Sequence, residues 1–296
     1  MLLLDAGNAL WKAGAGADGE TKRRAAFVLE TMGKLGTAAM AAGARDLTAG
    51  PAWLKEQSER AGVRIVSANL LDAGGKRLFP ASIVVDLAGK KIAVIGASPV
   101  GSFEDARGGP IVASVVAEAR KVRPKVDVVL VLAAVPYADA LQLSREAGTA
   151  VDFIFQSHEG RGIGPMQRGD SHFVLRTGDR GRQVGRLSID VAGVGPWVDP
   201  AELERNQQAM ASLEGHIAEV KRRLDAAPDA QTKAALEETA RHFAQRRNEL
   251  SAQVQAARTA GGRKVALDWL TLTGQFQEDA TLAAAVKRIE PHGAAH

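Results

Sequence analysis

The chain contains no cysteine among its 296 residues. This absence excludes disulfide bonds, thiolate metal sites, cysteine nucleophiles and attached c-type haem from the chain as given. It does not indicate a compartment, because a protein without cysteine is indifferent to the local redox potential.

Aromatic residues and long apolar runs are also scarce. Phe, Trp and Tyr make up 4% of the chain, so the core must be built mainly from Ala, Val and Leu. No apolar run approaches the roughly 20 residues of a membrane helix. The opening residues 1–5 are too short, and too soon acidic, for a signal peptide. We therefore expect no membrane span and no signal peptide in this chain.

Charge of one sign is not in large excess. The chain has 38 basic and 34 acidic residues, a net charge of +4, and the basic residues are spread along the sequence. This distribution favours an ordinary solvated surface with weak anion affinity. We expect no specific nucleic-acid binding.

Residues 1–197 alternate short apolar, β-branched runs with amphipathic stretches, the pattern of a layered α/β domain. The run Val128-Val129-Leu130-Val131-Leu132 is apolar on both faces, which predicts a strand buried between two layers. The expected strands cover residues 1–5, 39–42, 65–68, 82–87, 91–97, 126–132, 153–156, 172–176 and 184–191. The expected helices cover residues 20–34, 52–61, 109–122 and 139–147.

Residues 198–260 have a different pattern, without strand signals. Large apolar residues recur three, four or seven positions apart, and a break at Ala226-Ala227-Pro228-Asp229 divides them into two series. Asp229 is a suitable N-cap for the second series. We predict an inserted antiparallel helical hairpin with His216 and His242 on its surface.

Two roles remain open for this hairpin. Its helices can pack only on each other or on the main domain, or the segment 199–258 can self-associate or bind a protein partner. After the hairpin, residues 261–296 contain a strand pattern at 264–270 and a helix pattern at 279–289. We expect this last segment to return to the α/β domain.

Seven segments, taken in order, resemble the 5'-nucleotidase branch of the calcineurin-like metallophosphoesterases. The resemblance covers approximately residues 1–195 and implies an αββα sandwich of two sheets flanked by helices. It also implies that the family's first Asp-x-His strand and its nucleobase-binding second domain have no counterpart in this chain. The segments are residues 2–8, 35–46, 63–70, 91–96, 128–134, 151–160 and 181–187.

The same resemblance implies that the catalytic centre is degenerate. The chemistry of the family needs two divalent metals held by carboxylate, imidazole and Asn ligands, with a bridging hydroxide that attacks phosphorus. The bridging Asp of the family falls on Asn8, its Asn ligand on Ala44 and its catalytic His on Arg45. An alanine cannot bind a metal, and a neutral amide is a poor bridge between two cations.

Further metal ligands are missing downstream. The His of the family's SH motif falls on Ala134, and of its paired His residues only the first is matched, by His158. We therefore expect no catalytic residue and no metal, with His158 as a relic ligand or a hydrogen-bonded or solvated loop residue. A mononuclear site of His158, Glu159 and Asp46, holding Mn, Zn, Fe or Mg, is the alternative.

Arg45 gives the corner a different chemistry. A guanidinium supplies fixed positive charge and a bidentate fork for phosphate or carboxylate, but it cannot transfer protons at neutral pH. Arg45 can bind an anion, with Arg161, Arg107 and Arg168 as neighbours, or it can pair with Asp46 or Asp5. The candidate ligand-binding residues are Asn8, Arg45, Asp46, His158, Glu159 and Arg161.

The sequence thus favours a non-catalytic 5'-nucleotidase-like domain that binds a phosphate-like or nucleotide ligand or acts as an interaction scaffold. The alternative is a metal-dependent phosphoesterase with an altered site. Members of the resembled branch are usually exported in bacteria, which implies an extracytoplasmic location.

Overall fold

The computed structural model describes residues 1–157, 163–169, 171–178, 181–259 and 261–289. The chain divides into two compact units. The first, here called the α/β unit, comprises residues 1–186 and 269–296, and the second, the hairpin unit, comprises residues 187–268. None of the helices in the described ranges is both long and apolar enough to cross a membrane.

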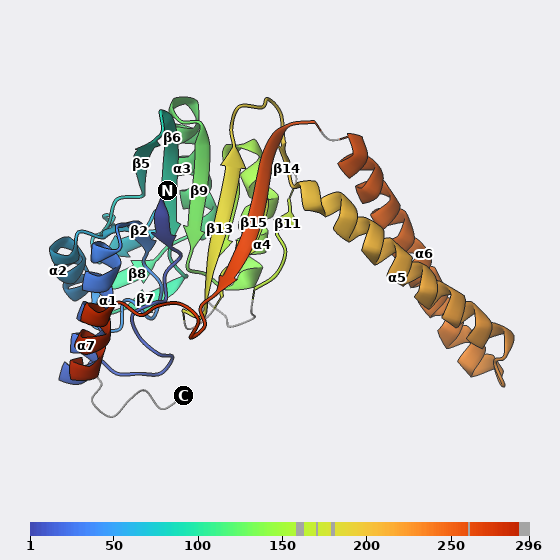
Figure 1. Cartoon of the computed structure of the whole chain (residues 1–296), viewed down its shortest axis with the longest axis horizontal. Helices are drawn as coiled ribbons and strands as arrows, with labels where there is room; N and C mark the ends of the chain where they lie inside the picture. Colours follow the sequence, from blue (N-terminus) through green and yellow to red (C-terminus); the bar gives the residue numbers. More distant parts are fainter. Residues whose placement is uncertain (158–162, 170, 179–180, 260, 290–296) are drawn as a thin grey trace. The chain divides into compact units, whose positions relative to one another are not determined.

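The largest sheet of the α/β unit has six strands in the order β11-β12-β10-β9-β6-β5. Its strands β5, β6 and β9 lie side by side in Figure 1. The four inner strands are parallel, and the two edge strands run antiparallel to their neighbours. Every residue of β9 is buried, as expected for a strand that is apolar on both faces. The strands are β5 (Ser82–Leu87), β6 (Lys90–Ala97), β9 (Val128–Ala133), β10 (Phe153–Gln156), β11 (Gln167–Arg168) and β12 (Phe173–Arg176).

Two helices, α3 (Ile111–Val122) and α4 (Tyr137–Ala147), pack on one face of this sheet. Fully buried aliphatic residues such as Val115, Leu143 and Ile154 fill the interface. Short 3-10 turns follow the helices, η1 (Arg123–Lys125) after α3 and η2 (Gly148–Ala150) after α4.

A second, parallel sheet has the order β1-β2-β3 and contacts the other face of the large sheet. Its helices, α1 and α2, pack on β2 and β3 and on each other. The layers are therefore helices, sheet, sheet, helices, and the predicted α/β class is confirmed. The elements are β1 (Leu3–Asp5), α1 (Gly19–Lys34), β2 (Thr37–Ala41), α2 (Pro51–Ala61) and β3 (Arg64–Val66).

The two sheets approach closely at Gly96 of β6. A Cβ atom placed there would lie 2.0 Å from the carbonyl oxygen of Val66 in β3. The backbone N–H of Ala68 also donates to the Gly96 carbonyl at 2.8 Å. Only glycine permits this contact between the sheets.

The sequence did not predict β4, β7, β8, β11 and β14. A small antiparallel sheet contains β4 (Leu70–Asp72), β8 (Ala106–Gly108) and β7 (Gly101–Phe103). A further sheet has the order β13-β15-β14, with β13 (Gln183–Asp190), β15 (Arg263–Thr271) and β14 (Trp197–Val198). β4, β7, β8, β11 and β14 have only two or three residues each, too few to show a periodicity. The last helix, α7 (Ala280–Ile289), belongs to the α/β unit.

In the hairpin unit, α5 (Pro200–Asp225) and α6 (Ala230–Thr259) pack along each other (Figure 1). Asp229 accepts the backbone N–H of Thr232 at 2.7 Å, which confirms it as a cap. His216 and His242 are exposed, as predicted.

The apolar stripes of the two helices face each other. Leu213 and Val220 of α5 and Leu236 and Leu250 of α6 are buried, and across the described residues of both helices no large apolar side chain is exposed. The apolar side chains of the hairpin therefore pack between its own two helices.

Candidate functional site

Three loops meet at the edge where the parallel strands β1, β2 and β10 end. Asn8 follows β1, Asp46 follows β2, and Ser157 directly follows β10. Hydrogen bonds join all three loops. In α/β folds, this carboxyl edge is where ligands usually bind.

Asp46 is fully buried, and its carboxylate is surrounded by backbone N–H donors. One oxygen, Oδ2, accepts from the backbone nitrogens of Asn8 at 2.6 Å and Gly43 at 2.9 Å. The other, Oδ1, accepts from Ala9 at 2.9 Å and Leu10 at 3.1 Å. A carboxylate offers about four acceptor sites, and these bonds use them. Asp46 thus holds the β1 and β2 loops together and has no oxygen left for a ligand.

Two acidic groups of this edge have raised pKa values. Burial raises the pKa of Asp46 to about 7, although the N–H donors of Asn8 and Gly43 act in the opposite direction. The negative charge of Asp5 adds to the rise. Burial also raises the pKa of Asp5 to about 6, opposed by the bond it accepts from the N–H of Gly7 at 2.7 Å. Both carboxyl groups are therefore harder to ionise than ordinary aspartates.

The side-chain amide of Asn8 joins the same three loops. Its Oδ1 accepts from the backbone nitrogen of Arg45 at 3.2 Å, and its Nδ2 donates to the carbonyl oxygen of Ser157 at 3.2 Å. Asn8 has a φ of 64°, in the left-handed region, which Asn tolerates better than most residues. The amide therefore has a defined structural role at this position.

The loops also touch directly through two glycines. A Cβ atom on Gly43 would lie 2.4 Å from Oδ1 of Asn8. A Cβ atom on Gly7 would lie 2.6 Å from the carbonyl oxygen of Ala41 and 2.9 Å from the Cβ of Ala134, a fully buried residue. Protein atoms are thus in close contact where these loops meet.

Arg45 lies in the β2 loop and is partly buried. Its carbonyl oxygen accepts the hydroxyl of Thr48 at 2.7 Å. Both carboxylate oxygens of Asp46 accept backbone N–H groups, and one oxygen of Asp5, Oδ1, accepts the backbone N–H of Gly7. The structure therefore brings Asn8, Arg45 and Asp46 together in one region.

No family model matches this chain, and no curated protein matches it. Solved structures do match. A 5'-nucleotidase precursor from Thermus thermophilus superposes with a TM-score of 0.55 at 22% identity, over 64% of this chain and 42% of that chain. The calcineurin-like phosphoesterase YfkN from Bacillus subtilis superposes with a TM-score of 0.53 at 16% identity, over 64% of this chain and 70% of that chain.

The fold is that of the calcineurin-like metallophosphoesterases. The NAD nucleotidase NadN of Haemophilus influenzae, with a TM-score of 0.54 at 17% identity, matches over 64% of this chain and 38% of that chain. The chain thus spans less than half the length of both matched nucleotidases.

The described residues do not fit the metal centre that this metallophosphoesterase fold implies. They contain no group of three or more His, Cys, Asp and Glu residues that could hold a metal ion. Asn8 offers an amide that already bonds to two loops, and Asp46 is saturated by backbone donors. Ala44 and Ala134 bring no ligand atom in their side chains.

The other residues that the sequence analysis singled out lie as follows. His158, Glu159 and Arg161 lie outside the described residues. Arg107 is on β8, and Arg168 is on β11, where its guanidinium stacks over the ring of Phe173 at 4.7 Å. The structure gives Arg107 and Arg168 no described contact with Arg45.

Two polar groupings were missed by the sequence analysis. Ser144 of α4 and His172, just before β12, form a buried hydrogen bond of 2.7 Å between Oγ and Nε2. Tyr137, at the start of α4, bonds through its hydroxyl to Gln167 of β11. Ser144 and His172 lie 28 positions apart in the sequence, and Tyr137 and Gln167 lie 30 apart, so no short sequence motif indicates either pair.

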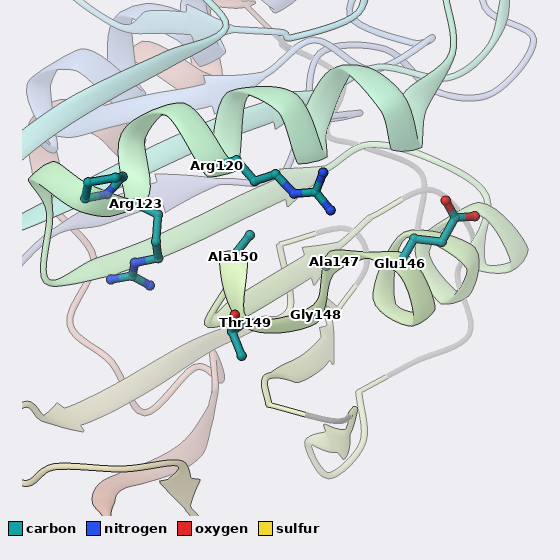
Figure 2. A pocket seen from close by; sticks show the side chains of 8 residues that line it. Arg120, Arg123, Glu146, Ala147, Gly148, Thr149 and Ala150 are labelled. Atoms are coloured by element: carbon teal, nitrogen blue, oxygen red, sulfur yellow. The ribbon is translucent and has the colours of Figure 1, made fainter.

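A cleft of about 330 Å³ lies at the opposite edge of the large sheet, where α3 and α4 end (Figure 2). Arg120 and Glu146 flank it, and Arg123 lines it but is held by Asp152 and by the carbonyl oxygens of Val126 and Asp127. This cleft therefore lies away from the loops that hold Asn8 and Asp46.

Proposed function

We propose that this chain is a non-catalytic domain of metallophosphoesterase fold that binds a phosphate-like anion at the carboxyl edge of its strands. The observation that carries this proposal is the bonding of Asn8 and Asp46. Both side chains, which fall within the metal-binding motifs of the resembled family, are used to join loops.

A two-metal mechanism needs anionic ligands to hold the ions and to bridge them. Asn8 is neutral, and its amide nitrogen donates to Ser157, so it presents a donor rather than a lone pair on that side. Asp46 lacks a free oxygen. These facts argue against a dinuclear centre, and we propose that no metal cofactor is bound.

Anion binding is proposed to centre on Arg45. Its guanidinium stays charged at every physiological pH and can hold two phosphate oxygens at once. The backbone N–H of Arg45 is fixed by Asn8, so the residue starts from a defined position on the loop. A bound phosphate would be held but not cleaved, because arginine provides no proton transfer.

The experiment combines calorimetric titration with a phosphatase assay on the purified chain. We expect inorganic phosphate and AMP to bind, without turnover, and Arg45→Ala to weaken binding. Arg120→Ala is the matched control, because Arg120 is exposed and lies at the opposite edge. Failure of both probes to bind at millimolar concentration, or unchanged affinity in Arg45→Ala, would contradict the proposal.

The alternative is a metal-dependent phosphoesterase that uses His158 and Glu159 with Mn, Zn, Fe or Mg. The structural likeness to a 5'-nucleotidase precursor and to a phosphoesterase favours this alternative. Stoichiometric metal in the purified chain, together with turnover that is lost in His158→Ala, would establish it in place of the first proposal.

We further propose that the hairpin unit serves as an interaction scaffold. Because no large apolar side chain in the described residues of α5 and α6 is exposed, contacts through these helices would be made mainly by polar and charged side chains. Sedimentation of the chain over a range of concentrations and salt tests self-association. A constant monomer mass would leave only a different protein as partner.

An extracytoplasmic location is also proposed. One structural relative is described as a precursor, and the branch that the sequence resembles is usually exported. Fractionation of cells that express the natural gene would test this, and recovery of the protein with cytoplasmic markers would refute it.

A further inference from the structure

Arg176 is the last residue of β12, at the same carboxyl edge as Asn8 and Arg45. It lies opposite Gln156 of β10 in the strand register, and Ser157, which accepts from Asn8, follows Gln156 directly. Val174, two residues earlier and hence on the same face of the strand, packs in the core that α3 and α4 cover. Arg176 therefore lies on the helix-covered face of the sheet.

The guanidinium of Arg176 is partly buried and has no compensating charge among the described residues. Its Nε is buried without a hydrogen-bond partner there. Its described contact is with the ring of Tyr137, whose centroid lies 5.9 Å from the guanidinium carbon. Asp139, in the first turn of α4, makes no described ion pair with it. A cation–π contact at this distance is weak, whereas removing an arginine from water without a partner is costly.

The surroundings of Arg176 are held in place. Gly164 lies close to the guanidinium, since a Cβ atom placed on it would lie 2.6 Å from Nη2 of Arg176. Trp269 donates from Nε1 to the carbonyl oxygen of Gly164 at 3.3 Å, and its ring packs against Gly185. Tyr137 is bonded to Gln167. The guanidinium of Arg176 is therefore surrounded by residues that are themselves held in place. A bound anion would compensate the energetic cost of leaving this charge without a partner.

We infer that Arg176 binds the phosphate group of a phosphate monoester at this edge, beside the ring of Tyr137. The inference rests on the proposed function and places a second cation at the same carboxyl edge of the strands. An arginine fork matches two phosphate oxygens, and charge-assisted bonds of this kind are stronger than neutral ones. Arg176 is a binding residue and contributes no chemical step.

The test compares wild type, Arg176→Met and Arg145→Met. Methionine keeps much of the side-chain volume and removes the charge. Arg145 is exposed on α4, so its variant carries the same change in net charge away from the site. Binding of inorganic phosphate, AMP and acetate is measured by calorimetry, and thermal unfolding of the free proteins is recorded in parallel.

We expect Arg176→Met to weaken AMP and phosphate binding about tenfold or more, the loss of one or two charge-assisted hydrogen bonds. Its melting temperature without ligand should equal or exceed that of wild type, because an unpaired charge has been removed. Arg145→Met should change neither property. Together, these results would show that Arg176 serves anion binding and not the stability of the fold.

Three results would overturn the inference. Unchanged affinity in Arg176→Met would show that the residue does not touch the anion. A fall in melting temperature of more than about 3 °C would show that it supports the fold. Binding of acetate but not phosphate would exclude the phosphate group. If Arg45→Ala loses binding while Arg176→Met keeps it, the proposed function survives alone, and if wild type binds no probe, both fail.

Discussion

The carboxylate of Asp46 accepts the backbone N–H of Asn8 at 2.6 Å, across 38 residues of sequence. This bond and its neighbours fix the β1 loop on the β2 loop. The relationship makes Asp46 the residue whose loss should most disturb this edge of the α/β unit.

Replacing Asp46 by asparagine should therefore destabilise the protein. An amide NH2 would face two of the backbone N–H donors that now share an oxygen, and both would be left buried without an acceptor. At about 1–3 kcal/mol for each of the two orphaned groups, we expect a loss of about 2–6 kcal/mol in the free energy of unfolding. Urea denaturation measures it. Asp105→Asn, at an exposed position, is the control, and equal stability of both variants would refute the role of Asp46.

Stability should also depend on pH in a defined direction. Asp46 and Asp5 have native pKa values raised to about 7 and about 6, from 3.8. Between pH 3.8 and these native pKa values, the native state binds more protons than the unfolded state. The free energy of unfolding therefore falls as pH rises. The contribution is complete below about pH 3.8 and is lost as pH passes through the two native pKa values.

Urea unfolding near pH 5 and near pH 8 tests this prediction. We expect wild type to be more stable at the lower pH and Asp5→Asn to show a smaller difference, since one of the two titrating groups is gone. A stability that rises between these pH values would contradict it.

Restoring a carboxylate at Asn8 should not restore a metal site. Asn8→Asp would lose the donor to Ser157 and add a negative charge beside Asp46 and Asp5. We expect a loss of about 1–3 kcal/mol near pH 8, a smaller loss near pH 5, and no binding of Mn. Asn8→Gly separates the backbone requirement from the amide bonds, because glycine accepts a φ of 64°. Tight Mn binding by Asn8→Asp would contradict this prediction.

The hairpin seam offers an independent test. Leu250 is 4% exposed and contributes to the packing of α6 on α5. Leu250→Ala should cost about 2–4 kcal/mol, the usual cost of a buried cavity. Amide hydrogen exchange within residues 200–259 should accelerate, whereas exchange in β9 should not change. Gln253→Ala, at an exposed position, is the control. Equal protection of the amides from hydrogen exchange in both variants would contradict the packing of Leu250 between α5 and α6.

Much of the fold followed from local patterns. β9 was predictable because the run from Val128 to Leu132 is apolar on both faces, and the hairpin because its apolar residues repeat at helical spacing. The two-residue strands β11 and β14 were not predictable, because partners elsewhere in their sheets define them.

The site was predictable only in part. The resemblance placed Asn8, Arg45 and Asp46 in one region, and the structure brings them together. It gave no sign that Asp46 binds four backbone N–H groups, because that depends on the direction of the chain in two loops. The sequence also did not predict the residues around Arg176, because Trp269 and Gly164 form a hydrogen bond across 105 residues of sequence.

The heptad spacing of α5 has a consequence for how the hairpin can vary. Leu203, Met210, Leu213, Ile217, Val220 and Leu224 follow steps of three, four or seven residues. Adding or deleting seven residues in each helix would preserve the seam and move the hairpin tip by about 10 Å from its base. The hairpin can therefore change its own length in steps of seven residues while its internal packing stays the same.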